Sequence, residues 1–298
     1  MAANLYTHQD ANVFKTWLLM AVFLGVVVGL GYVASWYFHS TAMLYGALIF
    51  ALVTNVWSYW YSDSVALALS GAQPADGAEY VELNRVVENL AITAGLPKPR
   101  VYVIDDPAPN AFATGRDKNH SAVAVTTGLL GMMNRSELEG VLAHELSHIG
   151  NRDILLSTVA VVLVGFVALL SDFFLRMSFW GGDRDNEDRN PITIVLAIVV
   201  MVLAPLVATL IQLAISRRRE YLADASGALL TRYPEGLASA LQKLGTYAAP
   251  MERASNATAH LFISNPFGAE AAMGTMSRLF STHPPIESRV EALVGKAQ

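Results

Sequence analysis

The stretch LAHELSHIGNRD, residues 142–153, is followed directly by ILLSTVAVVLVGFVALL, residues 154–170. The first stretch carries two histidines four positions apart, His144 and His148, with Glu145 directly after the first. The second begins an apolar run, residues 154–174, whose length can cross about 30 Å of hydrocarbon. The sequence therefore places a candidate metal site next to a candidate membrane helix.

The composition is that of an integral membrane protein. Hydrophobic residues make up 53% of the 298 residues and charged residues only 15%, whereas soluble domains usually have about 25% charged residues. The net charge of −5 provides no basic field for a nucleic acid, so none is expected as a partner. Because the chain has no cysteine, disulfides, thiolate ligands and a cysteine nucleophile are excluded.

Four apolar runs are long enough to span a lipid bilayer. They cover residues 16–38, 41–61, 154–174 and 192–215. The first run is too long for a signal peptide and the second follows it closely, so we interpret it as a membrane anchor. Four spans put the two hydrophilic segments on the same side of the membrane, where they can form one domain.

The predicted fold class is mainly α with a small β-sheet, in an integral membrane protein with four transmembrane helices. Its parts are an N-terminal hairpin (1–61), the first part of the hydrophilic domain (62–153), a second hairpin (154–215) and the second part of the domain (216–298). Basic residues lie on the domain side of the spans, notably Lys15, Arg152 and the triplet at 217–219. The positive-inside rule then predicts a cytoplasmic domain and cytoplasmic termini.

Residue periodicity gives the expected elements of the domain. Apolar residues at helical spacing predict a helix over 78–94, and short Val- and Thr-rich runs predict strands at 100–104 and 121–130. The HELSH stretch follows Asn134 and Ser136, either of which can cap a helix. Both histidines therefore lie on a helix.

Histidines four residues apart on a helix share one face, so His144 and His148 can bind one ion. Glu145 beside them could take a proton from a water activated by that ion. Each histidine alone could equally be an ordinary structural residue. A hydrolytic zinc site also needs a third protein ligand, and the position six residues after His148, where some families have a third histidine, holds Ile154.

The stretch SRRREYLADASG offers two carboxylates one helical turn apart, Glu220 and Asp224. Glu220 is the better candidate for the third ligand, and Asp224 for a carboxylate that orients a ligand histidine. The alternative is that Glu220 merely balances the three preceding arginines. The span count favours a ligand, because it brings this helix to the same side of the membrane as the HELSH helix.

Five motifs occur in a characteristic order: NAFATG (110–115), VAVTTGLL (123–130), AHELSHIGNRD (143–153), SRRREYLAD (216–224) and THPP (282–285). Over nearly the whole chain they resemble the HtpX-type membrane zinc metalloproteases, a gluzincin family. The resemblance implies one zinc ion bound by His144, His148 and Glu220, with Glu145 as general base and acid. It also implies a bacterial inner-membrane enzyme that cuts misfolded membrane proteins or other unfolded polypeptides at the cytoplasmic face under stress.

The resemblance further implies a substrate-binding strand. It predicts that the strand containing Val123, Ala124, Val125 and Thr126 lies at the edge of the sheet, where an extended substrate pairs with its backbone. By analogy, Asn110 lies near the same cleft.

The C-terminal segment STHPPIESRVEAL supplies two further candidate catalytic residues, His283 and Arg289. A donor on this segment could stabilise the oxyanion of the reaction, and the resemblance supports a role for both residues. Without the resemblance, we would interpret His283 as a helix-start residue and Arg289 as a surface partner of Glu287 or Glu291.

Several questions stay open in the sequence. Asp153 could cap a helix, support a metal ligand or lie on the surface, and residues 249–281 could form a flap over the cleft or a long surface connection. Several relatives have a histidine where this chain has Leu222, a position that the proposed ligand set does not use. A catalytically silent zinc-binding membrane scaffold is the main alternative function, although such a scaffold has no need of Glu145.

Overall fold

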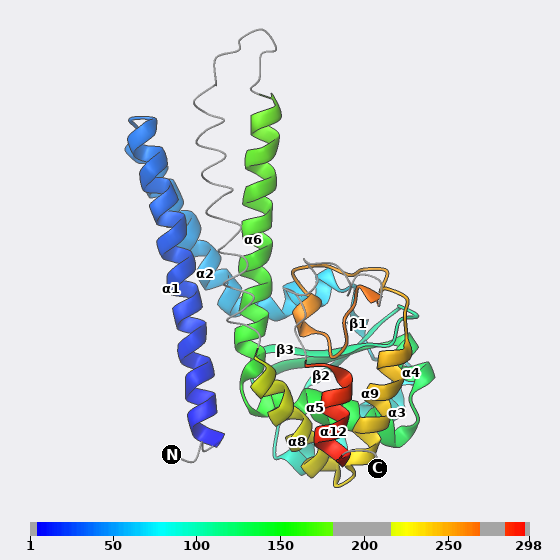
Figure 1. Ribbon diagram of the computed structural model, residues 1–298. Helices are drawn as coiled ribbons and strands as arrows, with labels where there is room; N and C mark the ends of the chain where they lie inside the picture. Colours follow the sequence, from blue (N-terminus) through cyan, green and yellow to red (C-terminus); the bar gives the residue numbers. More distant parts are fainter. Residues whose placement is uncertain (1–4, 181–215, 269–283, 296–298) are drawn as a thin grey trace.

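The computed structural model describes residues 5–180, 216–268 and 284–295. Three long helices stand beside a domain of shorter helices and strands (Figure 1). These helices are α1 (Leu5–Tyr37), α2 (Thr41–Leu69) and α6 (Asp153–Trp180), and they pack against one another. Apolar side chains such as Leu19, Phe23 and Leu163 fill the space between them. Most of the other large side chains on α1 and α2 are exposed, as expected for helices in lipid.

Two of the described helices, Asp10–Tyr37 and Thr41–Leu69, are long and apolar enough to cross a membrane. A third span results if the HELSH helix and the first part of α6, which meet at an angle of 85°, are taken together. The predicted run 192–215 lies outside the described residues. The membrane character of the chain is therefore supported, whereas four spans remain a prediction.

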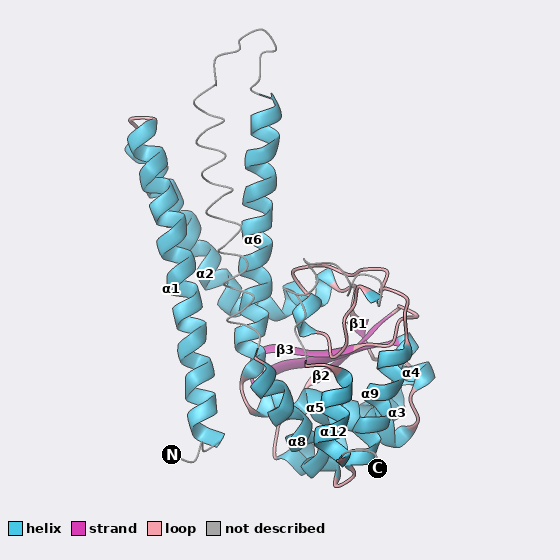
Figure 2. Ribbon diagram, viewed as in Figure 1, coloured by secondary structure: helices cyan, strands magenta, loops and turns pink. Residues whose placement is uncertain are grey.

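The domain contains a four-stranded sheet with the order β1-β2-β4-β3 (Figure 2). Its strands are β1 (Gln73–Pro74), β2 (Arg100–Ile104), β3 (Ala111–Asp117) and β4 (His120–Thr126). β2 and β4 are parallel, and the other two pairs are antiparallel. The strand predicted at 100–104 is confirmed. The one predicted at 121–130 ends at Thr126, whose hydroxyl caps the short helix α4 (Thr127–Met132) by accepting a hydrogen bond from the Leu129 N–H.

The prediction that Val123, Ala124, Val125 and Thr126 form an edge strand is wrong. These residues belong to β4, which pairs with β2 on one side and with β3 on the other. All four are buried, because both faces of the strand are covered. The hydrogen-bonding groups of their backbone are already engaged in the sheet, so a substrate cannot pair with them. Among the described strands, β3 forms the edge of the sheet next to β4.

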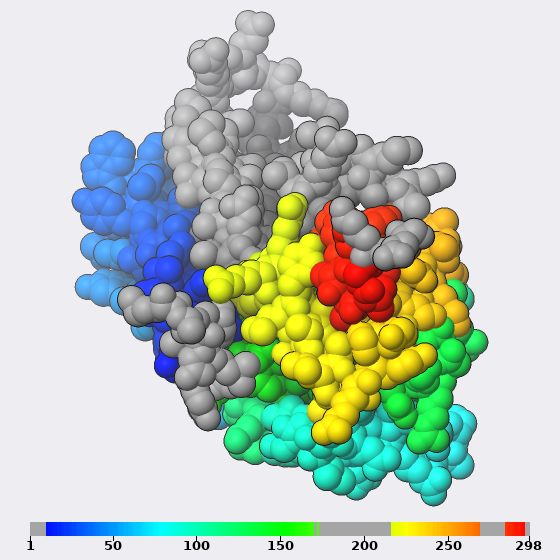
Figure 3. All heavy atoms as spheres, turned by 60° about the horizontal axis from the view of Figure 1, so that its bottom comes forward, coloured from blue at the N-terminus to red at the C-terminus, as the bar shows by residue number. Residues whose placement is uncertain are grey.

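Helices cover one face of the sheet. α3 (Val81–Ala94), preceded by the single turn η1 (Ala78–Tyr80), packs with α5 (Arg135–Gly150) and α9 (Pro234–Thr246) over an apolar core. α8 (Arg217–Thr231) and α12 (Ile286–Val294) complete this layer. α12 lies against α8 and α9, as the neighbouring red and yellow regions of Figure 3 show. The other face is covered by the end of α2 and by the segment around the turn η2 (Ala259–Leu261).

The HELSH helix α5 has well-defined ends. At its start, the Asn134 side chain accepts a hydrogen bond from the Glu137 N–H, and the Glu137 carboxylate accepts one from the Asn134 N–H. This capping box fixes the first turn. Lys243 of α9 also binds Glu137, at 2.6 Å. At the other end, Arg152 has a φ of 58°, and this left-handed residue turns the chain into α6.

Candidate metal centre

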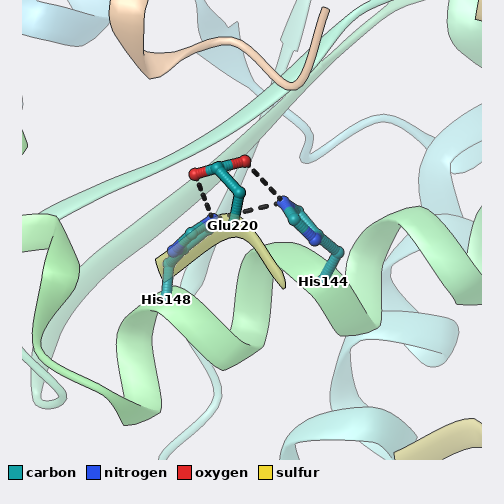
Figure 4. A group of neighbouring side chains, drawn as sticks. All are labelled: His144, His148 and Glu220. Carbon is teal, nitrogen blue, oxygen red and sulfur yellow. Dashed lines mark hydrogen bonds and ion pairs between the residues drawn. The ribbon is translucent and has the colours of Figure 1, made fainter. Parts of the chain in front are cut away.

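Three side chains from two helices converge at one point. His144 and His148 lie one turn apart on α5, and Glu220 reaches them from α8 (Figure 4). The Nε2 atoms of the two histidines are 3.2 Å apart. Glu220 Oε2 lies 3.7 Å from Nε2 of His144, and Oε1 lies 3.6 Å from Nε2 of His148. The structure thus brings together the three residues that the sequence predicts as ligands.

These separations fit a small divalent cation. Two imidazole nitrogens and a carboxylate oxygen, each held at about 2.0–2.2 Å from a tetrahedral ion, stand roughly 3.3–3.6 Å from one another. The donor atoms of His144, His148 and Glu220 all lie within 4.8 Å of one another. Nitrogen and oxygen donors without thiolate are the set found in hydrolytic zinc enzymes. The residues therefore fit zinc with little movement.

A glycine allows α8 to approach α5 closely enough to deliver Glu220. A Cβ atom at Gly227 of α8 would lie 3.0 Å from the backbone nitrogen of His144. Any larger residue there would have to push the two helices apart. Because Glu220 and Asp224 stand on this same helix, the close approach sets their distance to the ligand histidines.

Each ligand histidine has a carboxylate on its other ring nitrogen. Nδ1 of His144 lies 2.9 Å from Asp224 Oδ1, and Nδ1 of His148 lies 3.1 Å from Asp153 Oδ2. A carboxylate at this position accepts a hydrogen bond from the Nδ1–H group, which leaves Nε2 as the nitrogen that can bind a metal ion. Burial lowers the pKa of His148, but the hydrogen bond to Asp153 and the charge of Glu220 outweigh it and raise that pKa to about 9.

Arg289 of α12 stands behind His144 and is fully buried. Its Nε and NH2 atoms donate to the two oxygens of Asp224 at 2.8 and 2.6 Å. Burial raises the pKa of Asp224, but the bonds to Arg289 and His144 outweigh it and lower that pKa to about 2. The alternative that Arg289 is a surface partner of Glu287 or Glu291 is wrong. The guanidinium holds Asp224 and, through it, His144.

Glu145 lies beside the ligands in a small cavity and is buried. Apart from the ligands, the cavity lining includes Ala113 of β3, Leu261 and Ile263. Its volume is about 30 Å³, enough for a water molecule and far too little for a peptide. A carboxylate, three ligand atoms and space for water thus share one site.

The remaining predicted site residues lie away from the ligands or outside the described residues. The amide group of Asn110 binds the backbone of Ser264, its Nδ2 donating to the Ser264 oxygen at 2.9 Å and its Oδ1 accepting from the Ser264 nitrogen at 3.2 Å. Asn110 therefore anchors the segment 259–264 next to the cavity. His283 falls outside the described part of the chain, and its role stays a prediction.

The structure also assigns residues that the sequence left open or missed. Asp153 is the partner of His148 rather than a surface charge. Its position five residues after His148 hints at this, but the bend between α5 and α6 is needed to bring the two side chains together. Ala113 was not expected in the site, because β3 was not predicted as a strand.

A helix with the HExxH pattern, completed by a glutamate from a later helix and placed beside apolar membrane helices, defines a membrane metallopeptidase of the gluzincin type. The profile of Peptidase family M48 matches residues 78–297, and the chain belongs to this family. The resemblance to HtpX-type proteases is confirmed.

The sequence similarity to known relatives extends over nearly the whole chain. The protein described as "Protease HtpX homolog" from Caldanaerobacter subterraneus subsp. tengcongensis is 49% identical, and the alignment covers 97% of both chains. One of the same description from Pyrococcus furiosus is 49% identical over 94% of both chains. The crystal structure of S. mikatae Ste24p shares the fold, with a TM-score of 0.51 and 21% identity over 97% of this chain and 67% of that one.

Proposed function

We propose that this chain is a zinc-dependent endopeptidase that cuts misfolded or damaged membrane proteins, and other unfolded polypeptides, at the cytoplasmic face of the bacterial inner membrane. The observation that carries the proposal is the convergence of three ligand atoms within 4.8 Å of one another, with Glu145 in the same cavity. Membrane-protein quality control under stress is the corresponding cellular role.

In this mechanism, His144, His148 and Glu220 would hold the zinc ion. When bound, zinc would supply the positive charge that acidifies a water and polarises the substrate carbonyl. Glu145 takes the proton of the attacking water and passes it to the leaving amine. Asp224, held by Arg289, and Asp153 keep the two imidazole rings oriented, so the ligand atoms need no rearrangement during the reaction.

We place the substrate along the edge of β3. Two contacts define which residues face this edge: the Ala111 oxygen accepts from the Ile263 N–H at 2.9 Å, and the Gly115 N–H donates to Thr158 at 3.3 Å. The N–H and C=O groups of successive residues in a strand point in opposite directions. The backbone groups of Ala113, which lies between Ala111 and Gly115, therefore also point outward, toward the cavity. An extended peptide paired with Ala113 would place its carbonyl next to Glu145. Because Ile263 already binds the edge at Ala111, the segment 259–264 would have to move to admit that peptide.

Replacing Ala113 by proline should therefore lower kcat/KM for an unfolded substrate about 3- to 10-fold, the usual effect of one lost backbone hydrogen bond. Proline is tolerated at an edge position whose N–H points away from the sheet. The measurement is cleavage of casein by detergent-purified protein, with zinc content determined in parallel. Ala113→Ser keeps the N–H group and serves as the control. Equal kcat/KM for the proline and serine variants would place the substrate elsewhere.

The location and orientation are proposed from charge and hydropathy. Two described helices can cross a membrane, and Lys15, Arg152 and Arg217–Arg219 lie at the domain ends of the apolar runs. The positive-inside rule places such residues in the cytoplasm. The domain, the active site and both termini of a multi-pass protein then share that side.

The proposed function is tested by removing and restoring the metal. The purified protein should contain about one zinc per chain and cleave casein. A chelator such as 1,10-phenanthroline should abolish cleavage, and added zinc should restore it, because no residue of the site replaces the charge of the ion. Protein that binds zinc but cleaves neither casein nor unfolded membrane proteins would favour the catalytically silent scaffold.

A further inference from the structure

We propose that Asn12, on the first membrane helix α1, is a positioning residue of the metal centre. It fixes Asp153, the partner of the ligand His148, and joins it to Arg219, the neighbour of the ligand Glu220. The inference rests on the proposed function, because it assumes that these ligands bind zinc. It extends the site to a helix that contributes none of the ligands.

The Asn12 side chain is buried, and both ends of its amide group are bonded. Nδ2 donates to Asp153 Oδ1 at 2.6 Å and to the Asn151 oxygen at 3.3 Å. Oδ1 accepts from the Arg219 guanidinium at 3.4 Å. All these partners lie far away in sequence, at the end of α5, the start of α6 and the start of α8. One side chain of α1 thus connects the two elements that supply the metal ligands.

Asp153 transmits this contact to the metal site. Its Oδ2 binds Nδ1 of His148, while its Oδ1 binds Asn12. A carboxylate held through both oxygens cannot rotate about its last bond, so Oδ2 stays in the plane where it accepts the hydrogen bond from Nδ1 of His148. Without Asn12, the partner that remains for Oδ1 of Asp153 would be the guanidinium of Arg219, whose Nε lies 3.7 Å away. The carboxylate would then turn toward the guanidinium, and the ring of His148 would lose its fixed orientation.

Simple helix packing does not explain an asparagine at this position. The buried face of α1 farther along is apolar, with Leu19, Phe23 and Val27 in one cluster. A buried amide group is costly unless it is hydrogen-bonded, and Asn12 finds its partners around the metal ligands. Thr16 provides a contrast. It is also buried, but its hydroxyl donates within its own helix, to the backbone carbonyl oxygen of Asn12.

The test is the zinc affinity of full-length, detergent-purified variants, measured by competition with a chromophoric chelator. Asn12→Leu should weaken zinc binding about 3- to 10-fold, less than the 10- to 100-fold usual for a residue that touches a ligand, such as Asp153 in Asp153→Asn. The visible absorption bands of the Co²⁺-substituted protein should change in Asn12→Leu as well. Thr16→Val, one turn away on the same helix, should match wild type in both measurements.

A double variant separates positioning from a general loss of packing. If Asn12 acts through Asp153, Asn12→Leu should weaken zinc binding no further once Asp153→Asn is present. Affinity within twofold of wild type for Asn12→Leu, or losses that multiply in the double variant, would overturn the inference. If Asn12→Leu is not recovered folded, Asn12→Ser, too short to reach Asp153, is judged by the same criteria. Wild-type protein that binds no zinc would instead overturn the proposed function.

Discussion

Glu145→Gln should reduce peptide-bond cleavage by at least about 1000-fold while zinc binding stays within twofold of wild type. General acid–base catalysis contributes roughly 10²- to 10⁴-fold to enzymatic rates, and Glu145 would serve as both base and acid here. Glutamine has nearly the same shape but cannot accept the proton. Because the proposed ligands are His144, His148 and Glu220, the metal should remain. Casein cleavage and zinc content, measured on the same preparations, provide the two readouts.

The matched control is Glu139→Gln, the same chemical change on the same helix. Glu139 is partly exposed and pairs with Arg135 at the surface, so its replacement should leave cleavage unchanged. Cleavage by Glu145→Gln at more than a tenth of the wild-type rate would exclude Glu145 as the base. Loss of zinc from this variant would mean that Glu145 helps to hold the metal.

Arg289→Met should destabilise the packing of α8 and α12 by about 3–5 kcal/mol, the usual result of removing one partner of a buried ion pair. The guanidinium is fully buried and makes two hydrogen bonds to Asp224. After its removal, the Asp224 carboxylate would remain buried, with the imidazole of His144 as its remaining partner. The ring of His144 would also lose its fixed orientation, so zinc affinity should fall in the same variant.

Hydrogen exchange is the suitable measurement, because it reports on local opening. The five tryptophans, at positions 17, 36, 57, 60 and 180, all lie in α1, α2 and α6, so their fluorescence would report on those helices. Protection of the α8 and α12 amides should fall at least about 100-fold, since each 1.4 kcal/mol is a factor of ten. The control Arg135→Met removes an exposed arginine and should leave the protection of the α8 and α12 amides unchanged, because surface ion pairs contribute little to stability. Equal effects of the two variants would refute the role of Arg289.

The ligand set could be predicted from the sequence because it depends on local geometry. The spacing of His144 and His148 is one helical turn, and that of Glu220 and Asp224 is the same. The same kind of local rule predicted a helix cap at Asn134 or Ser136, and the structure has Asn134 as the cap. The count of apolar runs placed the two ligand helices on the same side of the membrane, and the family resemblance supplied the choice of Glu220 as the third ligand.

The sheet could not be predicted in the same way, because the position of a strand depends on its partners. The alternating run in β4 is also compatible with an edge strand, and only its pairing with both β2 and β3 shows that it is central. Similarly, local spacing suggested Glu287 or Glu291 as partners of Arg289. Its actual partner, Asp224, lies 65 residues away in the sequence. The link from Asn12 to Asp153 spans 141 residues.

The 85° angle between the HELSH helix and α6 has a consequence for which bonds can be cut. If α6 crosses the bilayer as predicted, α5 would run nearly parallel to the membrane plane, and His144 and His148 would lie at similar heights above the lipid. Asp153, bonded to both His148 and Asn12, links the two helices at this corner. The proposed active site would then lie at a fixed height above the membrane. Under the proposed function, a membrane protein would be cut only where enough unfolded chain emerges from its membrane segment to reach that height.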